Sequence, residues 1–97
     1  MNKYSLSKTP QDLLTLTADR HRRLRKKKKF TQKALAERSG VSLGSLKRFE
    51  QNGQISFENL LKLAQILGQL DAFEHLFSIN DQTKEVEQLF SKKARGL

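Results

Sequence analysis

The sequence predicts an all-α fold, a compact bundle of five helices with a candidate sixth helix toward the C-terminal end. Apolar residues recur at intervals of three and four along most of the chain, as they do on one face of a helix. The only proline is Pro10 and the five glycines are scattered singly, so the turn signals typical of β-hairpins are scarce. The 97 residues suffice for one domain. We expect it at residues 9–78, between a flexible N-terminal tail at 1–8 and a weakly amphipathic helix or partly disordered basic tail at 79–97.

The first helix is expected at residues 10–27. Thr9 is suited to the N-cap, because its hydroxyl can accept a hydrogen bond from a free backbone N–H, and Pro10 fits the first helical position. Asp12 places a negative charge in the first turn, where the helix dipole favours it. The side chains expected to face the core are Leu13, Leu14, Thr17, His21 and Leu24.

Two short helices are expected next, at 32–38 and at 42–51. Thr31 and Ser42 are suited to their N-caps. Gly40 can adopt the left-handed conformation that ends the first of the two helices.

The connection between these two helices is only three residues long, Ser39 to Val41. Two short helices joined so closely through a glycine must cross steeply, as in a helix-turn-helix. Ala36 is small enough to let the pair approach closely. The apolar residues expected to anchor the second helix on the first are Val41, Leu46 and Phe49.

An apolar helix is expected at 57–67, and its composition predicts that it is the central, buried one. A short fifth helix is expected at 70–77. Residues 80–93 carry Val86, Leu89 and Phe90 at helical spacing, which indicates either a sixth helix or a tail that orders only on a partner.

Positive charge is concentrated in one part of the chain. The net charge of the whole chain is +9, but residues 20–48 alone hold twelve Lys and Arg against Glu37, whereas residues 49–91 are net acidic. The run RHRRLRKKKKF at 20–30 is the densest part. This segregation predicts one basic face that docks on a polyanion and one acidic to neutral face that meets protein. Double-stranded DNA, RNA and anionic lipid are all candidate polyanions at this point.

Several classes of protein are not expected. Cysteine is absent, so neither a disulfide nor a thiolate metal site can form, and a cytoplasmic setting fits best. No apolar run approaches the roughly 18 residues that span a bilayer. His21 and His75 are the only histidines, and no phosphate-binding glycine loop, metal cluster or nucleophile motif is present. We therefore expect no enzyme, no cofactor, no metal site and no membrane partner.

The stretch TQKALAERSGVS at 31–42, followed by Leu46, Phe49-Glu50 and Asn52-Gly53, resembles the Cro/lambda-repressor (Xre) family of helix-turn-helix regulators. The resemblance covers about residues 13–77, the five-helix extent of that DNA-binding domain. It implies that the helix at 42–51 enters the major groove, that the start of the helix at 32–38 sits on phosphate, and that a homodimer binds an inverted-repeat DNA operator.

The resemblance also assigns individual residues. The outward face of the recognition helix would carry the base-reading residues Leu43, Gly44, Lys47 and Arg48. Family members often read adenine with two glutamines at the first two of these positions, and Leu and Gly cannot do so. Three interpretations remain. Leu43 would contact a thymine methyl group, Gly44 would allow close approach of the backbone, and Lys47 and Arg48 would contact guanine or phosphate. Leu43 could instead be a packing residue near the cap.

Further residues would position the protein without reading bases. The expected phosphate-binding residues are Gln32, Ser42, Ser45, Asn52, Arg22, Lys26, Lys29 and Lys33. Gln32 would contact phosphate through both its backbone N–H and its side-chain amide. The resemblance implies a structural salt bridge between Arg25 and Glu50, which removes Arg25 from the DNA-binding set. His21, on an apolar stripe, is expected to be a partly buried packing residue.

A finer resemblance concerns residues 40–77, which are similar to HipB-type antitoxins. Such proteins pair with HipA-like kinase toxins and repress their shared operon. This implies a transcriptional repressor that acts at the nucleoid in the bacterial cytoplasm, with the half at 49–91 facing the toxin or a second copy. A stand-alone or phage-type repressor and a protein-bridging adaptor with the same fold are the alternatives.

Overall fold

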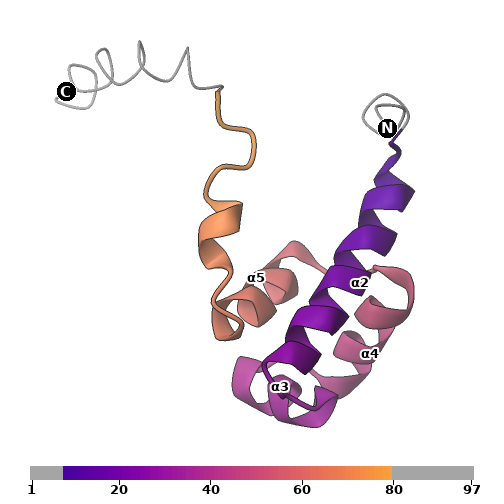
Figure 1. Ribbon diagram of the computed structural model, residues 1–97, viewed down its shortest axis with the longest axis vertical. Helices are drawn as coiled ribbons and strands as arrows, with labels where there is room; N and C mark the ends of the chain where they lie inside the picture. Colours follow the sequence, from indigo (N-terminus) through magenta and orange to yellow (C-terminus); the bar gives the residue numbers. More distant parts are fainter. Residues whose placement is uncertain (1–7, 80–97) are drawn as a thin grey trace, which may run out of the picture.

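The computed structural model describes residues 8–79 (Figure 1). This part of the chain forms four α-helices and one short 3-10 helix, and it contains no β-strand. In chain order the elements are α2 (Pro10–Lys27), α3 (Gln32–Ser39), α4 (Leu43–Asn52), α5 (Phe57–Ile66) and the 3-10 helix η1 (Leu70–Phe73). The predicted all-α fold is therefore confirmed, whereas five α-helices are not.

Each α-helix begins at a capping hydroxyl. The side-chain oxygens of Thr9, Thr31, Ser42 and Ser56 each accept a hydrogen bond from the backbone N–H three residues later, at 3.0–3.1 Å. Thr9 also donates its backbone N–H to the Asp12 carboxylate at 3.1 Å, which completes a capping box. These caps satisfy N–H groups that have no partner within a helix, and they set where each helix starts.

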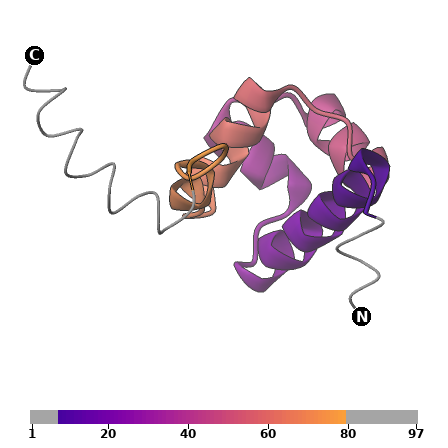
Figure 2. The same cartoon turned by 90° about the horizontal axis from the view of Figure 1, so that it is seen from above.

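The core is built mainly by α3, α4 and α5. The largest fully buried side chains are Leu35, Leu46, Phe49, Leu63 and Leu67. The helix α4 packs against both α2 and α3, while α3 also contacts α5. The 3-10 helix follows α5, where the ring of Phe73 meets that of Phe57 edge to face at 6.0 Å. Figures 1 and 2 both place residues 70–79 far from the start of α2.

The buried face of α2 differs from the predicted one. Leu13 and Leu14 are 46% and 38% exposed, whereas Ala18, His21 and Arg25 are the buried residues of the helix. Of the predicted inward side chains, His21 is buried and Leu24 packs against the core, whereas Leu13, Leu14 and Thr17 are exposed. The reason is that α2 packs on the buried carboxylate of α4, so His21 and Arg25 face inward, beside Ala18.

Two predictions for the second half were also wrong. In α5 only Leu63 and Ala64 are buried and Phe57 is 55% exposed, so this helix covers one side of the core instead of forming its centre. The fifth helix predicted at 70–77 is replaced by η1 and turns. Short isolated helices are marginal in water, η1 buries none of its residues, and Phe77 takes the left-handed φ of 64° that ends helical pairing.

The predicted sixth helix at 80–93 lies outside the described residues, as do nearly all of both predicted tails. Among residues 8–79, no helix is long and apolar enough to cross a bilayer.

Candidate nucleic-acid interface

The helices α3 and α4 form the predicted helix-turn-helix, and they run in clearly different directions in Figure 1. Gly40 ends α3 in the left-handed conformation, with φ of 82° and its N–H donating to the Ala36 carbonyl at 3.0 Å. Val41 follows and is buried, and Ser42 caps α4. The connection is therefore Gly40 to Ser42, one residue later than predicted.

The helix α4 has one buried and one exposed face. Leu46, Phe49 and Glu50 are buried, and they hold the helix against the rest of the domain. Gly44, Lys47 and Arg48, by contrast, are all exposed. The helix therefore presents a fixed row of side chains to solvent, as a probe of a DNA groove requires.

Leu43 and Gly44 differ in their freedom. Leu43 is only half-exposed and packs against the core, which agrees with its interpretation as a packing residue near the cap. A Cβ atom built on Gly44 would meet nothing within 4 Å. The protein's own packing therefore gives no reason for a glycine at position 44.

A buried polar network lies beneath this exposed face and joins three helices. The Glu50 carboxylate of α4 accepts hydrogen bonds from Arg25 Nε and Nη2 of α2, both at 2.9 Å. His21 Nδ1, also of α2, lies 2.7 Å from Glu50 Oε2, and Gln32 Nε2 of α3 donates to Oε1 at 3.0 Å. Arg25 and Glu50 are each 6% exposed. The structure thus brings together the pair that the resemblance implied, with two further partners.

The Glu50 carboxylate is ionised at neutral pH. Burial by itself raises the pKa of this group, but hydrogen bonds from His21, Arg25 and Gln32, together with the Arg25 charge, outweigh burial and lower the pKa from 4.5 to about 2. An ionised carboxylate can only accept hydrogen bonds. The His21 Nδ1 atom therefore carries the proton in its contact with Glu50.

Arg25 also shapes the loop between α2 and α3. Its Nη1 donates to the Phe30 carbonyl at 3.0 Å, in addition to its contacts with Glu50. Lys29, within this loop, has a φ of 64°, which is an uncommon conformation for a residue other than glycine. A guanidinium held by both contacts is not free to bind a ligand.

Gln32 lies differently from the sequence expectation. Its side-chain amide was expected at a phosphate, but the amide donates to Glu50 inside the domain. Gln32 is also the first residue of α3, so its backbone N–H has no partner within the helix and lies at the positive end of the helix dipole. Of the two expected phosphate contacts, the backbone contact is the one that this geometry favours.

A polar cleft of about 460 Å³ lies where α2, α3 and α4 meet. Its lining brings together three of the expected DNA-contacting residues, Arg22, Gln32 and Lys47. Gln51 lines the cleft as well, which the sequence did not indicate. Arg22 Nη2 donates to Asp19 Oδ1 at 2.8 Å, but this pair is partly exposed and hence weakly held. The cleft can accept an anionic group between Arg22 and Lys47.

The remaining candidate residues lie around these elements. Ser42 Oγ accepts from the Ser45 N–H and donates to Ser45 Oγ at 2.9 Å, so Ser45 keeps its own hydroxyl proton for an outside acceptor. Asn52 Oδ1 accepts from the Gln54 N–H, which leaves the Asn52 NH2 group as a donor. The exposed lysines among the candidates are Lys26, Lys29 and Lys33.

No cluster of three His, Asp or Glu side chains that could hold a metal ion occurs within residues 8–79. His21, predicted as a partly buried packing residue, is buried and meets the Phe49 ring edge to face at 5.0 Å, and in addition it contacts Glu50 through Nδ1. Its position four residues before Arg25 was a signal for this role, since residues four apart share one face of a helix.

Comparison with known proteins agrees with this geometry. A family model described as helix-turn-helix, of the Cro/C1 type, matches residues 22–74, which is more than half of the chain. Neither the curated proteins nor the solved structures give a significant match. The matched family consists of DNA-binding regulators and is not an enzyme family. The chain therefore belongs to the Cro/C1-type helix-turn-helix family and is a DNA-binding regulator.

Proposed function

We propose that the protein is a sequence-specific transcriptional repressor that binds double-stranded DNA as a homodimer. Its operator would be an inverted repeat whose half-sites lie about one helical turn apart. The observation that carries this proposal is the division of α4 into a buried face and an exposed face with Gly44, Lys47 and Arg48. A helix so anchored can enter the major groove without rearrangement of the domain.

The exposed face of α4 would read the bases. Arg48 is the preferred base reader, because a guanidinium can donate two hydrogen bonds to guanine O6 and N7. Lys47 would contact guanine or, from the rim of the polar cleft, a phosphate. Gly44 would let the DNA approach the helix backbone closely, and the exposed part of Leu43 would meet a thymine methyl group.

Other groups would hold the DNA backbone. The N-terminus of α3 at Gln32 would bind a phosphate through its backbone N–H, as helix N-termini commonly do. Arg22 would exchange its exposed contact with Asp19 for a second phosphate. The further phosphate contacts would come from Ser42, Ser45, Asn52, Lys26, Lys29 and Lys33. If a dimer neutralises about six to eight phosphates, log affinity falls with log salt concentration with a slope of about −5 to −7.

The test is binding of the full chain to the DNA upstream of its own gene, measured by fluorescence anisotropy at about 150 mM salt. A scan of base substitutions should reveal two symmetric half-sites, and scrambled DNA should bind at least about a thousandfold more weakly. Arg48→Ala should cost about 1–3 kcal/mol on the operator and relax the preference at one base pair in each half-site. Equal affinity for operator and scrambled DNA would contradict the proposal.

A narrower form of the proposal is an antitoxin that represses the operon it shares with a HipA-like kinase, in the cytoplasm and at the nucleoid. It is supported by large apolar side chains that are exposed on and after α5 and so are accessible to a second protein. They are Phe57, Leu70, Leu76, Phe77 and Ile79. The neighbouring genes test this form directly. A kinase gene beside this one, whose product co-purifies with the chain, would support it.

The alternatives predict different results. A stand-alone or phage-type repressor would bind its operator with no kinase gene beside it. A protein-bridging adaptor would be monomeric, would bind a protein partner tightly, and would show no preference among DNA sequences. The operator scan and the oligomeric state in solution therefore separate the three cases.

A further inference from the structure

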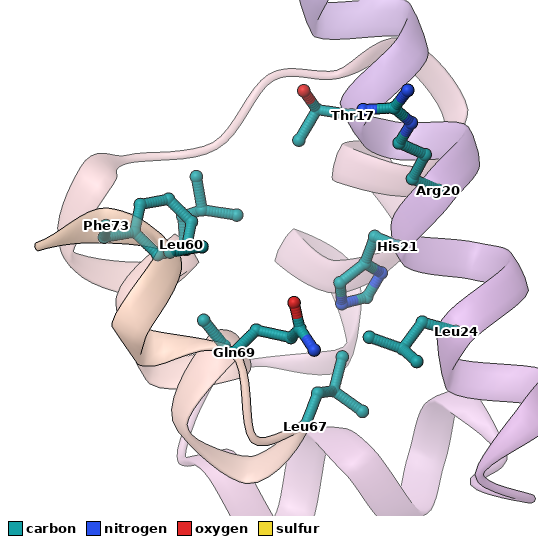
Figure 3. Close-up of a pocket in the computed structure, with 10 residues that line it drawn as sticks. Thr17, Arg20, His21, Leu24, Leu60, Leu67, Gln69 and Phe73 are labelled. Carbon is teal, nitrogen blue, oxygen red and sulfur yellow. The ribbon is translucent and has the colours of Figure 1, made fainter. Parts of the chain in front are cut away.

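A pocket of about 260 Å³ lies between α2, α5 and η1 (Figure 3), and it shares no lining residue with the polar cleft. Most of its wall is apolar, and Leu24, Leu60, Leu67 and Phe73 supply much of that surface. His21 is the buried polar residue of the wall. We call this space the α2–α5 pocket.

The His21 ring is bound on one side only. Its Nδ1 contacts the Glu50 carboxylate, while its Nε2 is buried and has no hydrogen-bond partner among residues 8–79. The whole residue is 8% exposed. Since Nδ1 donates to the Glu50 carboxylate, Nε2 is the hydrogen-bond acceptor of the tautomer that carries a single proton. Buried polar atoms without a partner are rare in folded proteins, and each one needs an explanation.

The polar side chain that faces the ring across the pocket does not supply that partner. Figure 3 shows the amide of Gln69 pointing toward the His21 ring across the pocket, but no hydrogen bond joins the two residues. Thr17 and Arg20 lie toward another part of the wall in the same view. The pocket thus combines a mostly apolar lining with one buried ring nitrogen, His21 Nε2, that is held at a fixed position, and this is the usual composition of a small-molecule site.

We propose that the α2–α5 pocket binds a small aromatic molecule that donates one hydrogen bond to His21 Nε2. A dry cavity of about 150 Å³ lined by apolar side chains can hold benzene. A pocket of about 260 Å³ has room for two fused rings. The His21 imidazole is fixed through Glu50, so the acceptor is already oriented before the ligand enters. The proposal does not depend on DNA binding.

The test uses the full chain and two probes that differ in one group. Indole and indene have the same fused-ring shape, but only indole has an N–H donor. Each is titrated against the protein while amide NMR spectra and the ring nitrogen resonances of His21 are recorded. We expect saturable shifts around Thr17, His21 and Gln69, roughly two- to tenfold tighter binding of indole than of indene, and a shift of Nε2 with indole alone.

Two leucine substitutions separate binding in the pocket from binding elsewhere. Ala72 lines the pocket, so Ala72→Leu fills it while leaving the His21 contact with Glu50 in place, and it should abolish indole binding. Asp71 is the neighbouring residue of η1 and does not line the pocket, so Asp71→Leu should bind indole as the wild type does. Helical circular dichroism confirms that both variants are folded.

The outcomes that would overturn the proposal are equally specific. Absence of saturable binding, equal affinity for indole and indene, or unchanged indole binding by Ala72→Leu would each do so. All three are independent of whether an operator is found, so failure here is distinguishable from failure of the repressor proposal.

Discussion

Substitution of Glu50 by Gln removes one buried charge with almost no change in shape. The carboxylate accepts hydrogen bonds from His21, Arg25 and Gln32, all at 2.7–3.0 Å. A glutamine can accept through its oxygen alone, and its NH2 group then faces donors. Arg25, 6% exposed, is left without a compensating charge. Removal of one partner from a buried ion pair typically costs about 3–5 kcal/mol.

The pKa of Glu50 gives a second route to the same magnitude. A pKa lowered from 4.5 to about 2 on folding corresponds to about 3 kcal/mol of stability at neutral pH. Because the folded-state pKa is the lower one, this contribution is complete above pH 4.5 and is lost as the pH falls toward 2. The stability difference between wild type and Glu50→Gln should therefore be largest at neutral pH and shrink toward zero near pH 2.

Urea unfolding of the full chain measures this difference. The chain has no tryptophan, so circular dichroism of its helices is the suitable signal. Glu58→Gln is the matched control, because Glu58 is a helical glutamate whose side chain is 79% exposed and whose contact with Lys62 is 3.6 Å long. It should cost less than about 1 kcal/mol. The reasoning is refuted if Glu50→Gln costs no more than this control at neutral pH, or if its cost does not change with pH.

Three further substitutions test separate parts of the structure. Gly44→Ala should raise the free energy of unfolding by about 0.5–1 kcal/mol, measured in urea, because the added Cβ meets nothing within 4 Å. The same substitution should weaken operator binding, measured by anisotropy. Gly53→Ala should lower the free energy of unfolding by about 2 kcal/mol or more, because its φ is 82° and its Cβ would lie 2.7 Å from Leu14 Cβ; a stable variant would contradict the close packing of that loop on α2. Lys33→Ala should weaken binding of the dimer to all DNA sequences alike, and it should make the slope of log affinity against log salt concentration shallower by about 2. A loss of affinity confined to the operator would instead indicate base reading.

Local signals in the sequence predicted most of the helix positions. Three capping residues, Thr9, Thr31 and Ser42, and the helix-ending Gly40 were identified from the sequence, and the helices lie within one residue of the predicted bounds from 10 to 67. These signals are reliable because a cap acts on backbone groups within three residues of itself. The segment at 70–77 has no capping residue or helix-ending glycine of this kind. The prediction of an α-helix there was wrong, and the structure has a 3-10 helix without a side-chain cap.

The orientation of α2 could not be predicted in the same way. The predicted stripe contained His21, which is buried, but it began at Leu13 and Leu14, which are exposed, and it omitted Arg25, which is buried. Polar residues face inward here only because their partner, Glu50, is also buried, on a helix 25 residues later in the chain. The resemblance implied the pairing of Arg25 with Glu50. For His21 the signal was its position four residues before Arg25, whereas nothing in the sequence indicated Gln32 as a further partner.

The buried network and the exposed face of α4 give different tasks to adjacent residues. Glu50 is fixed by three side chains, whereas the side chains of Arg48 and Lys47, two and three residues earlier, make no hydrogen bond to any residue in the described part of the chain. Their substitution should therefore change which DNA sequence is bound at little cost in stability. Gln32 belongs to both tasks, since its amide supports Glu50 while its backbone N–H lies at the start of α3. The Glu50 carboxylate thus holds both the start of α3, where the proposed phosphate contact lies, and the recognition helix α4. The spacing between the base contacts and the phosphate contact is therefore fixed.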